Sequence, residues 1–79
     1  MNNSDVTQSI DASGLRCPMP LLKTKKALSS LQCNQVLKVI ATDVGAKRDI
    51  PSFVALTSHE LLGVEETSDG YIFFIRKGE

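Results

Sequence analysis

The residue with the clearest chemical potential is Cys17, which lies in the run GLRCPMP at positions 14–20. Proline fits the first turn of a helix, because the backbone N–H there has no intrahelical partner and the fixed φ is already helical. Pro18 and Pro20 therefore predict a helix that begins directly after Cys17. A thiol ahead of that helix feels the positive end of its dipole, and Arg16 beside it acts in the same direction. We therefore expect Cys17 to be an exposed, reactive thiol with a lowered pKa.

An inert core residue is the ordinary alternative for a lone cysteine in a small domain. The neighbours of Cys17 argue against this alternative. Gly14 predicts a tight bend at the end of a strand, so that the thiol falls at a strand-to-helix junction between Arg16 and Pro18. Such a junction is poorly placed for burial, and we interpret Cys17 as accessible.

The chain offers few other groups for chemistry. Cys33 lies about 15 residues further along, roughly 20 Å or more on a helix, and is interpreted as a bystander thiol. With one histidine and two cysteines, no metal site is expected. His59 could be imagined as a base for Cys17. A place in the last turn of the second predicted helix, where a histidine interacts with free carbonyls, is the better interpretation.

Length and composition predict one small soluble domain. The chain has 79 residues, nine basic and nine acidic, which gives zero formal charge and argues against nucleic-acid binding driven by bulk charge. Residues 1–5 are polar and expected to be loose, and residues 6–79 are expected to form the single domain. Neither a signal peptide nor a membrane-spanning run is found in the sequence, so a reducing, cytoplasmic setting is expected.

Apolar periodicity predicts six elements in the order strand, helix, strand, helix, strand, strand. The strands are expected over residues 6–12, 35–42, 61–67 and 71–75, and the first helix over residues 18–32. Asn34 is expected to stop that helix in a left-handed conformation. After a loop over residues 43–47, Asp49 is expected to be the N-cap of the second helix, with Pro51 in its first turn.

This order predicts an α/β fold in two layers. Strand–helix–strand units have right-handed crossovers, which place both helices on the same face of the sheet. The last strand is apolar on both faces and therefore belongs inside the sheet. The other face of the sheet would be partly bare, which leaves room for a partner or a weak dimer.

With GLRCPMP before the first helix and RDIP at positions 48–51, the chain resembles the TusA/SirA family of small sulfur-carrier proteins. The resemblance runs from about Ile10 to Gly78 and includes DASG at positions 11–14 and IRKG at positions 75–78. It implies a β-α-β-α-β-β, two-layer sandwich. Two helices would cover one face of a four-stranded mixed sheet, with the last strand antiparallel inside it.

The resemblance also implies a function. Cys17 would accept a sulfane sulfur as a persulfide from a donor protein, such as a cysteine desulfurase or a rhodanese-like protein, and relay it to an acceptor protein. Thiolation of tRNA, sulfur oxidation and cofactor maturation are the routes it leaves open. No cofactor beyond the transient persulfide, no membrane, no direct nucleic-acid binding and no turnover of a small substrate are expected. The expected positioning residues are Gly14, Arg16, Pro18, Pro20, Asp49 and Pro51. The expected partner contacts are Arg16, Met19, Lys23, Lys26 and Arg48.

The chain departs from the tRNA-thiolation members of the family in three places. Met19 stands where an acidic residue is common, Val44 where proline often follows Asp43, and Asn34 where glycine is frequent. Two alternative functions stay open at this point. A thiol redox or regulatory module would need a resolving cysteine near Cys17. A non-catalytic RNA-binding module is suggested by fold analogy alone, and the neutral charge argues against it.

Overall fold

The six elements occur in the predicted order in a computed structural model that describes residues 5–79. Their bounds are β1 (Gln8–Ala12), α1 (Met19–Ser29), β2 (Val36–Ala41), α2 (Val44–Ala55), β3 (Glu60–Thr67) and β4 (Gly70–Arg76). Four of the five residues in the segment expected to be loose, 1–4, lie outside the described residues.

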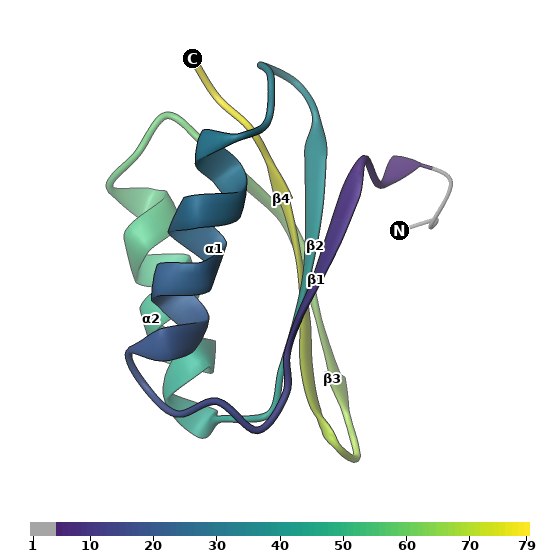
Figure 1. The fold of residues 1–79 in the computed structure, drawn as a ribbon, viewed down its shortest axis with the longest axis vertical. Helices are drawn as coiled ribbons and strands as arrows, with labels where there is room; N and C mark the ends of the chain where they lie inside the picture. The colour runs from purple at the N-terminus through teal and green to yellow at the C-terminus, as the bar shows by residue number, and fades with distance from the viewer. Residues whose placement is uncertain (1–4) are drawn as a thin grey trace.

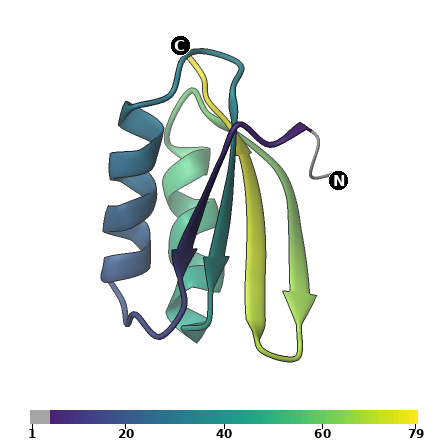
Figure 2. The same cartoon turned by 45° about the vertical axis from the view of Figure 1, so that its right-hand side comes forward.

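The sheet has the strand order β1-β2-β4-β3. β1 pairs with β2 in parallel, and β4 pairs antiparallel with both β2 and β3. Both helices pack on the same face of this sheet, and within residues 5–79 neither helix covers the other face (Figures 1 and 2). The predicted two-layer sandwich and mixed sheet are confirmed, including the antiparallel last strand between two neighbours.

The core lies between the sheet and the helices. Alternate residues of the central strands point toward the helices, and Val39 of β2 pairs with Phe73 of β4, both fully buried. Leu28 of α1 and Ile50 of α2 cover them from the helical layer. This period of two in the strands is the expected pattern for a sheet with one face against a core.

The first helix is shorter than predicted. It ends at Ser29, whereas the sequence pattern continues to Gln32. The hydroxyls of Ser29 and Ser30 donate hydrogen bonds to the carbonyls of Lys26 and Ala27. Such bonds compete with helix continuation. Asn34 has the predicted left-handed conformation, with φ of 73°, but lies in the turn beyond the helix end.

The second helix begins earlier than predicted, and the prediction that Asp49 caps it was wrong. The N-cap is Asp43, whose carboxylate accepts a hydrogen bond from the N–H of Gly45. Pro51 lies inside the helix instead of in its first turn. Proline was misleading here because it is usually excluded from a helix interior, where it removes one hydrogen bond. Asp49 therefore lies within the helix and is free for another role.

Both helices begin at the end of the sheet where the parallel strands finish (Figure 2). We call this region, residues 13–19 and 42–45, the thiol end. The β3–β4 hairpin turn lies at the same end, where Gly70 approaches β2 so closely that a Cβ would lie 2.3 Å from the Ala41 carbonyl oxygen. The two connections of the thiol end therefore lie at the same end of the sheet as the β3–β4 hairpin turn.

Candidate thiol site

The loop before α1 holds Cys17 at the thiol end. Gly14 has φ of 80°, a left-handed conformation that favours glycine, and its N–H donates a 2.8 Å hydrogen bond to Thr42 Oγ1. The N–H of Leu15 donates to the carbonyl of Ala12, which closes the turn. The predicted tight bend at Gly14 is present, and it ties the thiol loop to the end of β2. Cys17 is exposed, as predicted.

Asp43 ties the thiol loop to the second helix. Its Oδ2 accepts hydrogen bonds from the backbone N–H of Cys17 at 3.3 Å and of Gly45 at 3.1 Å. Gly45 is required for this close approach, because a Cβ there would lie 2.8 Å from Asp43 Oδ2 and 3.3 Å from the Cys17 Cβ. One carboxylate therefore caps α2 and fixes the backbone that carries the thiol.

Replacing Asp43 by alanine is expected to lower the free energy of unfolding by about 1 kcal/mol, the usual cost of losing an N-cap. Urea unfolding followed by circular dichroism would measure it. Asp43→Asn keeps an acceptor oxygen and should cost much less. Equal losses in the two variants would contradict the capping role.

Asp49 makes the closest contact to the sulfur. Cys17 Sγ donates a hydrogen bond to Asp49 Oδ2 over 2.8 Å. The other oxygen, Oδ1, lies 3.3 Å from Arg48 Nε in an ion pair. The Asp49 side chain retains 19% of its exposure, whereas that of Arg48 retains 81%. Asp49 was expected from the sequence as a positioning residue that caps the second helix, whereas the structure shows it inside α2 with a hydrogen bond to the sulfur.

The expected low pKa of Cys17 was wrong. The hydrogen bond to Asp49 raises the pKa of this thiol, and partial desolvation and the charges of Asp49 and Asp43 act in the same direction. Arg48 opposes them and lowers that pKa. The same hydrogen bond lowers the pKa of the Asp49 carboxyl, with a further contribution from Arg48. At neutral pH the arrangement is therefore a thiol that donates to a carboxylate.

The α1 dipole was expected to lower the pKa of Cys17, and the local contacts around the helix start outweigh this effect. Pro18 is the N-cap of α1, and no side chain caps this helix. The N–H of Met19, the first residue of α1, donates a hydrogen bond to the carbonyl of Arg16 over 2.8 Å. Pro20 is buried in the first turn and supports the helix start as predicted.

The expected partner contacts lie on two sides of α1. Arg16 and Met19 are exposed at the thiol end, and Met19 keeps 48% of its exposure. Lys23 Nζ donates to the carbonyl of Asp11, and Lys26 is exposed above the same strand edge. The structure therefore brings Arg16 and Met19 together with Cys17, and places Lys23 and Lys26 along β1.

Three large apolar side chains near the helix starts are exposed, which was not predicted from the sequence. Leu22 in α1 keeps 47% of its exposure, and Val44, at the start of α2, keeps 71%. Together with Met19 they are large apolar side chains near the starts of the two helices. The apolar periodicity of a helix does not show which of its apolar side chains stay exposed, so the exposure of Leu22 could not be predicted from the sequence.

The remaining candidates lie far from the thiol. Cys33 is a free thiol in the turn that follows α1, beyond the end of that helix remote from Cys17 (Figure 1). His59 lies after α2, not in its last turn as predicted, and its Nδ1 accepts a hydrogen bond from the N–H of Gly78. Burial and Lys77 lower the pKa of His59. The hydrogen bond of His59 therefore ties the segment after α2 to the C-terminal residues that follow β4.

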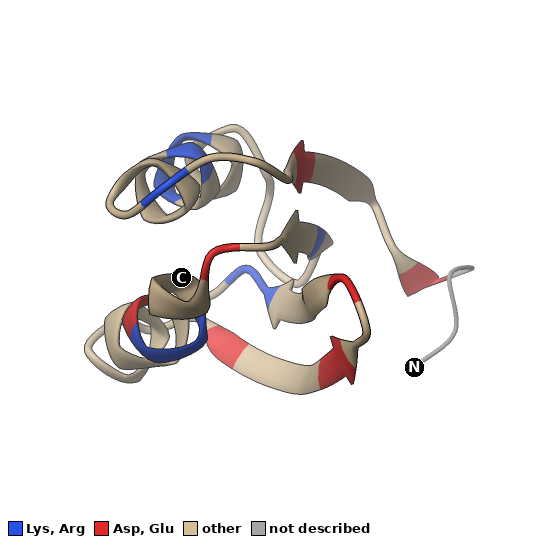
Figure 3. Ribbon diagram, turned by 90° about the horizontal axis from the view of Figure 1, so that it is seen from below, with Lys and Arg blue, Asp and Glu red and all other residues tan. Residues whose placement is uncertain are grey.

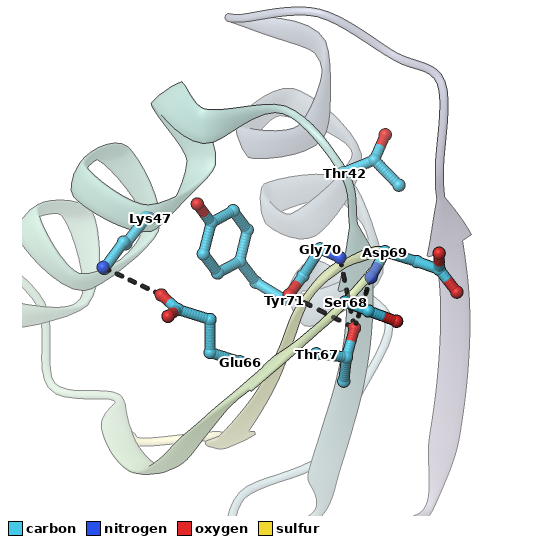
Figure 4. A pocket seen from close by; sticks show the side chains of 8 residues that line it. All are labelled: Thr42, Lys47, Glu66, Thr67, Ser68, Asp69, Gly70 and Tyr71. Carbon is cyan, nitrogen blue, oxygen red and sulfur yellow. Dashed lines mark hydrogen bonds and ion pairs between the residues drawn. The ribbon is translucent and has the colours of Figure 1, made fainter.

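An open polar hollow of about 480 Å³ lies beside the thiol end. It is lined by Thr42, Lys47 and residues 66–71 of the β3–β4 hairpin. Figure 4 shows Lys47 paired with Glu66, and Thr67 Oγ1 accepting from the N–H groups of the hairpin turn. These groups satisfy one another, and Cys17 is not among the lining residues.

The two charge types are concentrated on different elements. Figure 3 looks onto the thiol end and shows basic residues gathered on α1 and acidic residues along β3 and its hairpin. α1 contains three lysines and no acidic residue, whereas β3 contains three glutamates. Within residues 5–79, no group of three or more potential ligands could hold a metal ion, and no helix is long and apolar enough to span a bilayer.

These observations define a class: a small two-layer α/β domain with one exposed thiol between the starts of its two helices. The comparisons then identify the family. The model of the family described as "Sulfurtransferase TusA" matches residues 8–77, and the chain belongs to this family of sulfur carriers. Membership implies one protein that donates sulfur and another that accepts it.

Individual relatives agree with this assignment. The chain is 43% identical over 74 residues to the sulfur carrier protein TusA of Allochromatium vinosum, covering 94% of this chain and 97% of the relative. It is 46% identical over 69 residues to TusA of Pseudomonas entomophila, covering 87% and 86%. The crystal structure of a SirA-like protein from Desulfitobacterium hafniense superposes with a TM-score of 0.77 at 27% identity, covering 92% of this chain and all of that one.

Proposed function

We propose that this protein carries a sulfane sulfur as a persulfide on Cys17, taken from a donor protein and passed to an acceptor protein. The observation that carries the proposal is the exposed Cys17 thiol, which lies just before α1 in a chain that belongs to a sulfur-carrier family. A cysteine desulfurase or a rhodanese-like protein is the proposed donor. The two free cysteines suit a reducing compartment such as the cytoplasm.

The transfer needs little beyond an accessible thiol. The Cys17 sulfur attacks the terminal sulfur of the donor's persulfide, and the S–S bond of the donor breaks as the new one forms. The thiol proton of Cys17 leaves, and the departing donor thiolate takes up one proton. No net oxidation occurs, and delivery to the acceptor repeats the step with Cys17 as the leaving group. We propose tRNA thiolation as the first acceptor route to test, although Met19 and Val44 depart from its family pattern.

Intact-mass measurement after incubation with a cysteine desulfurase and cysteine tests this function. The mass should rise by one sulfur atom, and a reductant should reverse the gain. A chain that gains no mass while a known acceptor thiol in the same tube does would contradict the proposal.

An intramolecular redox reaction fits the geometry poorly. α1 alone has 11 residues, about 16 Å of helix, and Cys17 and Cys33 lie beyond its opposite ends. A disulfide requires Cα atoms within about 7 Å. A resolving thiol would have to come from a second molecule.

We propose that Lys23 and Lys26, on the side of α1 that lies along β1, attract the donor protein electrostatically toward the thiol end. Lys26→Glu should slow sulfur acceptance about threefold at low salt and much less at high salt, because screening weakens steering. Rates of persulfide formation at two ionic strengths would show this.

Lys25→Glu is the matched control for this prediction. It makes the same charge change one residue away, but Lys25 Nζ lies 5.1 Å from the Phe53 ring centroid, on the side of α2. If Lys25→Glu slowed acceptance as much as Lys26→Glu, the effect would come from net charge and not from a docking side of α1.

A further inference from the structure

The Cys17 thiol and the Asp49 carboxylate form an oriented hydrogen-bonded pair. Asp49 Oδ2 accepts from Sγ at 2.8 Å while Oδ1 is paired with Arg48, so both oxygens are engaged and the carboxylate is held in orientation. Asp49 belongs to α2, which gives it a rigid support, and its side chain is four-fifths buried. Whether the hydrogen bond forms therefore depends on whether Sγ of Cys17 carries a proton, and not on movement of the Asp49 side chain.

Only one state of Cys17 can make this hydrogen bond. In the thiol, Sγ carries a proton and donates it. In the thiolate, and in the persulfide, Sγ carries no hydrogen. The terminal sulfur of a persulfide is more acidic than a thiol and is ionised at neutral pH, so Asp49 Oδ2 loses its donor and faces electron-rich sulfur. Asp43, whose carboxylate lies at the backbone of Cys17, adds a second negative charge. Arg48 on α2 is the cation that opposes them, and Arg16 is the exposed neighbour in the loop.

We propose that Asp49 stabilises the unloaded, protonated state of Cys17 over its persulfide, and thereby favours release of the carried sulfur. The inference rests on the proposed carrier function and gives Asp49 a role in the release of the carried sulfur. In the release step, an incoming thiol attacks the sulfane sulfur of the Cys17 persulfide, and the S–S bond to Cys17 breaks. Sγ takes up the proton of the incoming thiol, and the hydrogen bond to Asp49 re-forms. Both sides hold one persulfide and one thiol, so the step needs no oxidant.

Alkylation of Cys17 in the free protein tests the first half of the proposal. The rate with iodoacetamide, a small neutral reagent, should be measured against pH in the wild type and in Asp49→Asn. Loss of the carboxylate should move the midpoint to lower pH. A tenfold gain in thiolate fraction at neutral pH comes with roughly a threefold loss of nucleophilicity. Alkylation should therefore become about threefold faster near neutral pH and about threefold slower at high pH, where all of the thiol is ionised.

Sulfur exchange with glutathione tests the second half. The persulfide form of each protein should be equilibrated with excess glutathione, and the loaded fraction measured by intact mass. The ratio of loaded to unloaded Asp49→Asn protein should exceed that of the wild type by about three- to tenfold, the range expected when a hydrogen bond to a charged carboxylate is replaced by one to a neutral amide. Glu65→Gln makes the same charge change on β3, opposite Ile72, and should behave as the wild type.

Arg48→Gln provides a second variant in case Asp49→Asn fails to fold. It removes the cation that opposes Asp49, so its alkylation midpoint should move to higher pH and its loaded fraction should fall. An unchanged midpoint and an unchanged loaded fraction in the folded variant would overturn the inference, while the carrier function would stand. If no protein formed a persulfide on Cys17, the carrier function would fail, and the alkylation midpoints would still decide the role of Asp49.

Discussion

Cys17→Ser is expected to lose all sulfur loading, whereas Cys33→Ser is expected to keep it in full. A hydroxyl in place of the thiol retains the size of the side chain and its hydrogen bond to Asp49, but it cannot form a persulfide. Cys33 lies beyond the far end of α1 and has no carboxylate partner comparable to Asp49 among the described hydrogen bonds. Intact mass after incubation with a cysteine desulfurase and cysteine measures both variants.

The two serine variants also control for folding. Circular dichroism should give the same spectrum for both, because both cysteines are exposed and neither belongs to the core. Loading that persisted in Cys17→Ser, or that disappeared in Cys33→Ser with the fold intact, would contradict the assignment of the carried sulfur to Cys17.

Phe73→Ala is expected to have the largest effect on the fold. Phe73 is fully buried on β4, an inner strand of the sheet, and it faces the helices. Truncation of a buried phenylalanine costs about 3–5 kcal/mol. A 79-residue domain has roughly 4–12 kcal/mol of stability in total. We therefore expect the variant to lose a large part of its free energy of unfolding, as a lowered midpoint in urea unfolding would show.

Phe53→Ala is the matched control for Phe73. Phe53 is only partly buried on α2, where it packs against the edge of the core and under Lys25. The same truncation should therefore cost clearly less. If Phe53→Ala proved as destabilising as Phe73→Ala, the core would be centred on the helices and not on β4.

Much of the fold could be predicted because its elements have strong periodicity. The apolar runs of β2 and β4 and the helical stripe of α1 identified these elements, and the right-handed crossover of strand–helix–strand units placed both helices on one face of the sheet. The helix boundaries were less accurate, because they depend on single polar contacts. Asp43 and Asp49 are both plausible caps before Pro51, and only the contact to Gly45 shows that Asp43 is the one used.

The electrostatics of the site could not be predicted from neighbours in sequence. Arg16 stands beside Cys17 in the chain and suggested a thiolate. The carboxylate that decides the protonation of the thiol is 32 positions away, on α2. Its approach depends on the packing of the two helix starts and on the missing side chain at Gly45. A cysteine at a helix start therefore has a low pKa only where the fold brings no acid to it.

The most direct test of the account is to locate the carried sulfur in the wild-type protein. The chain would be loaded with labelled sulfur by a cysteine desulfurase, alkylated and digested with trypsin. Cleavage after Arg16, Lys23, Lys26 and Lys38 separates the two thiols into peptides 17–23 and 27–38. We predict the labelled persulfide in peptide 17–23 and its disappearance once an acceptor protein is added. Label in peptide 27–38, or no label in either peptide, would contradict the central claim.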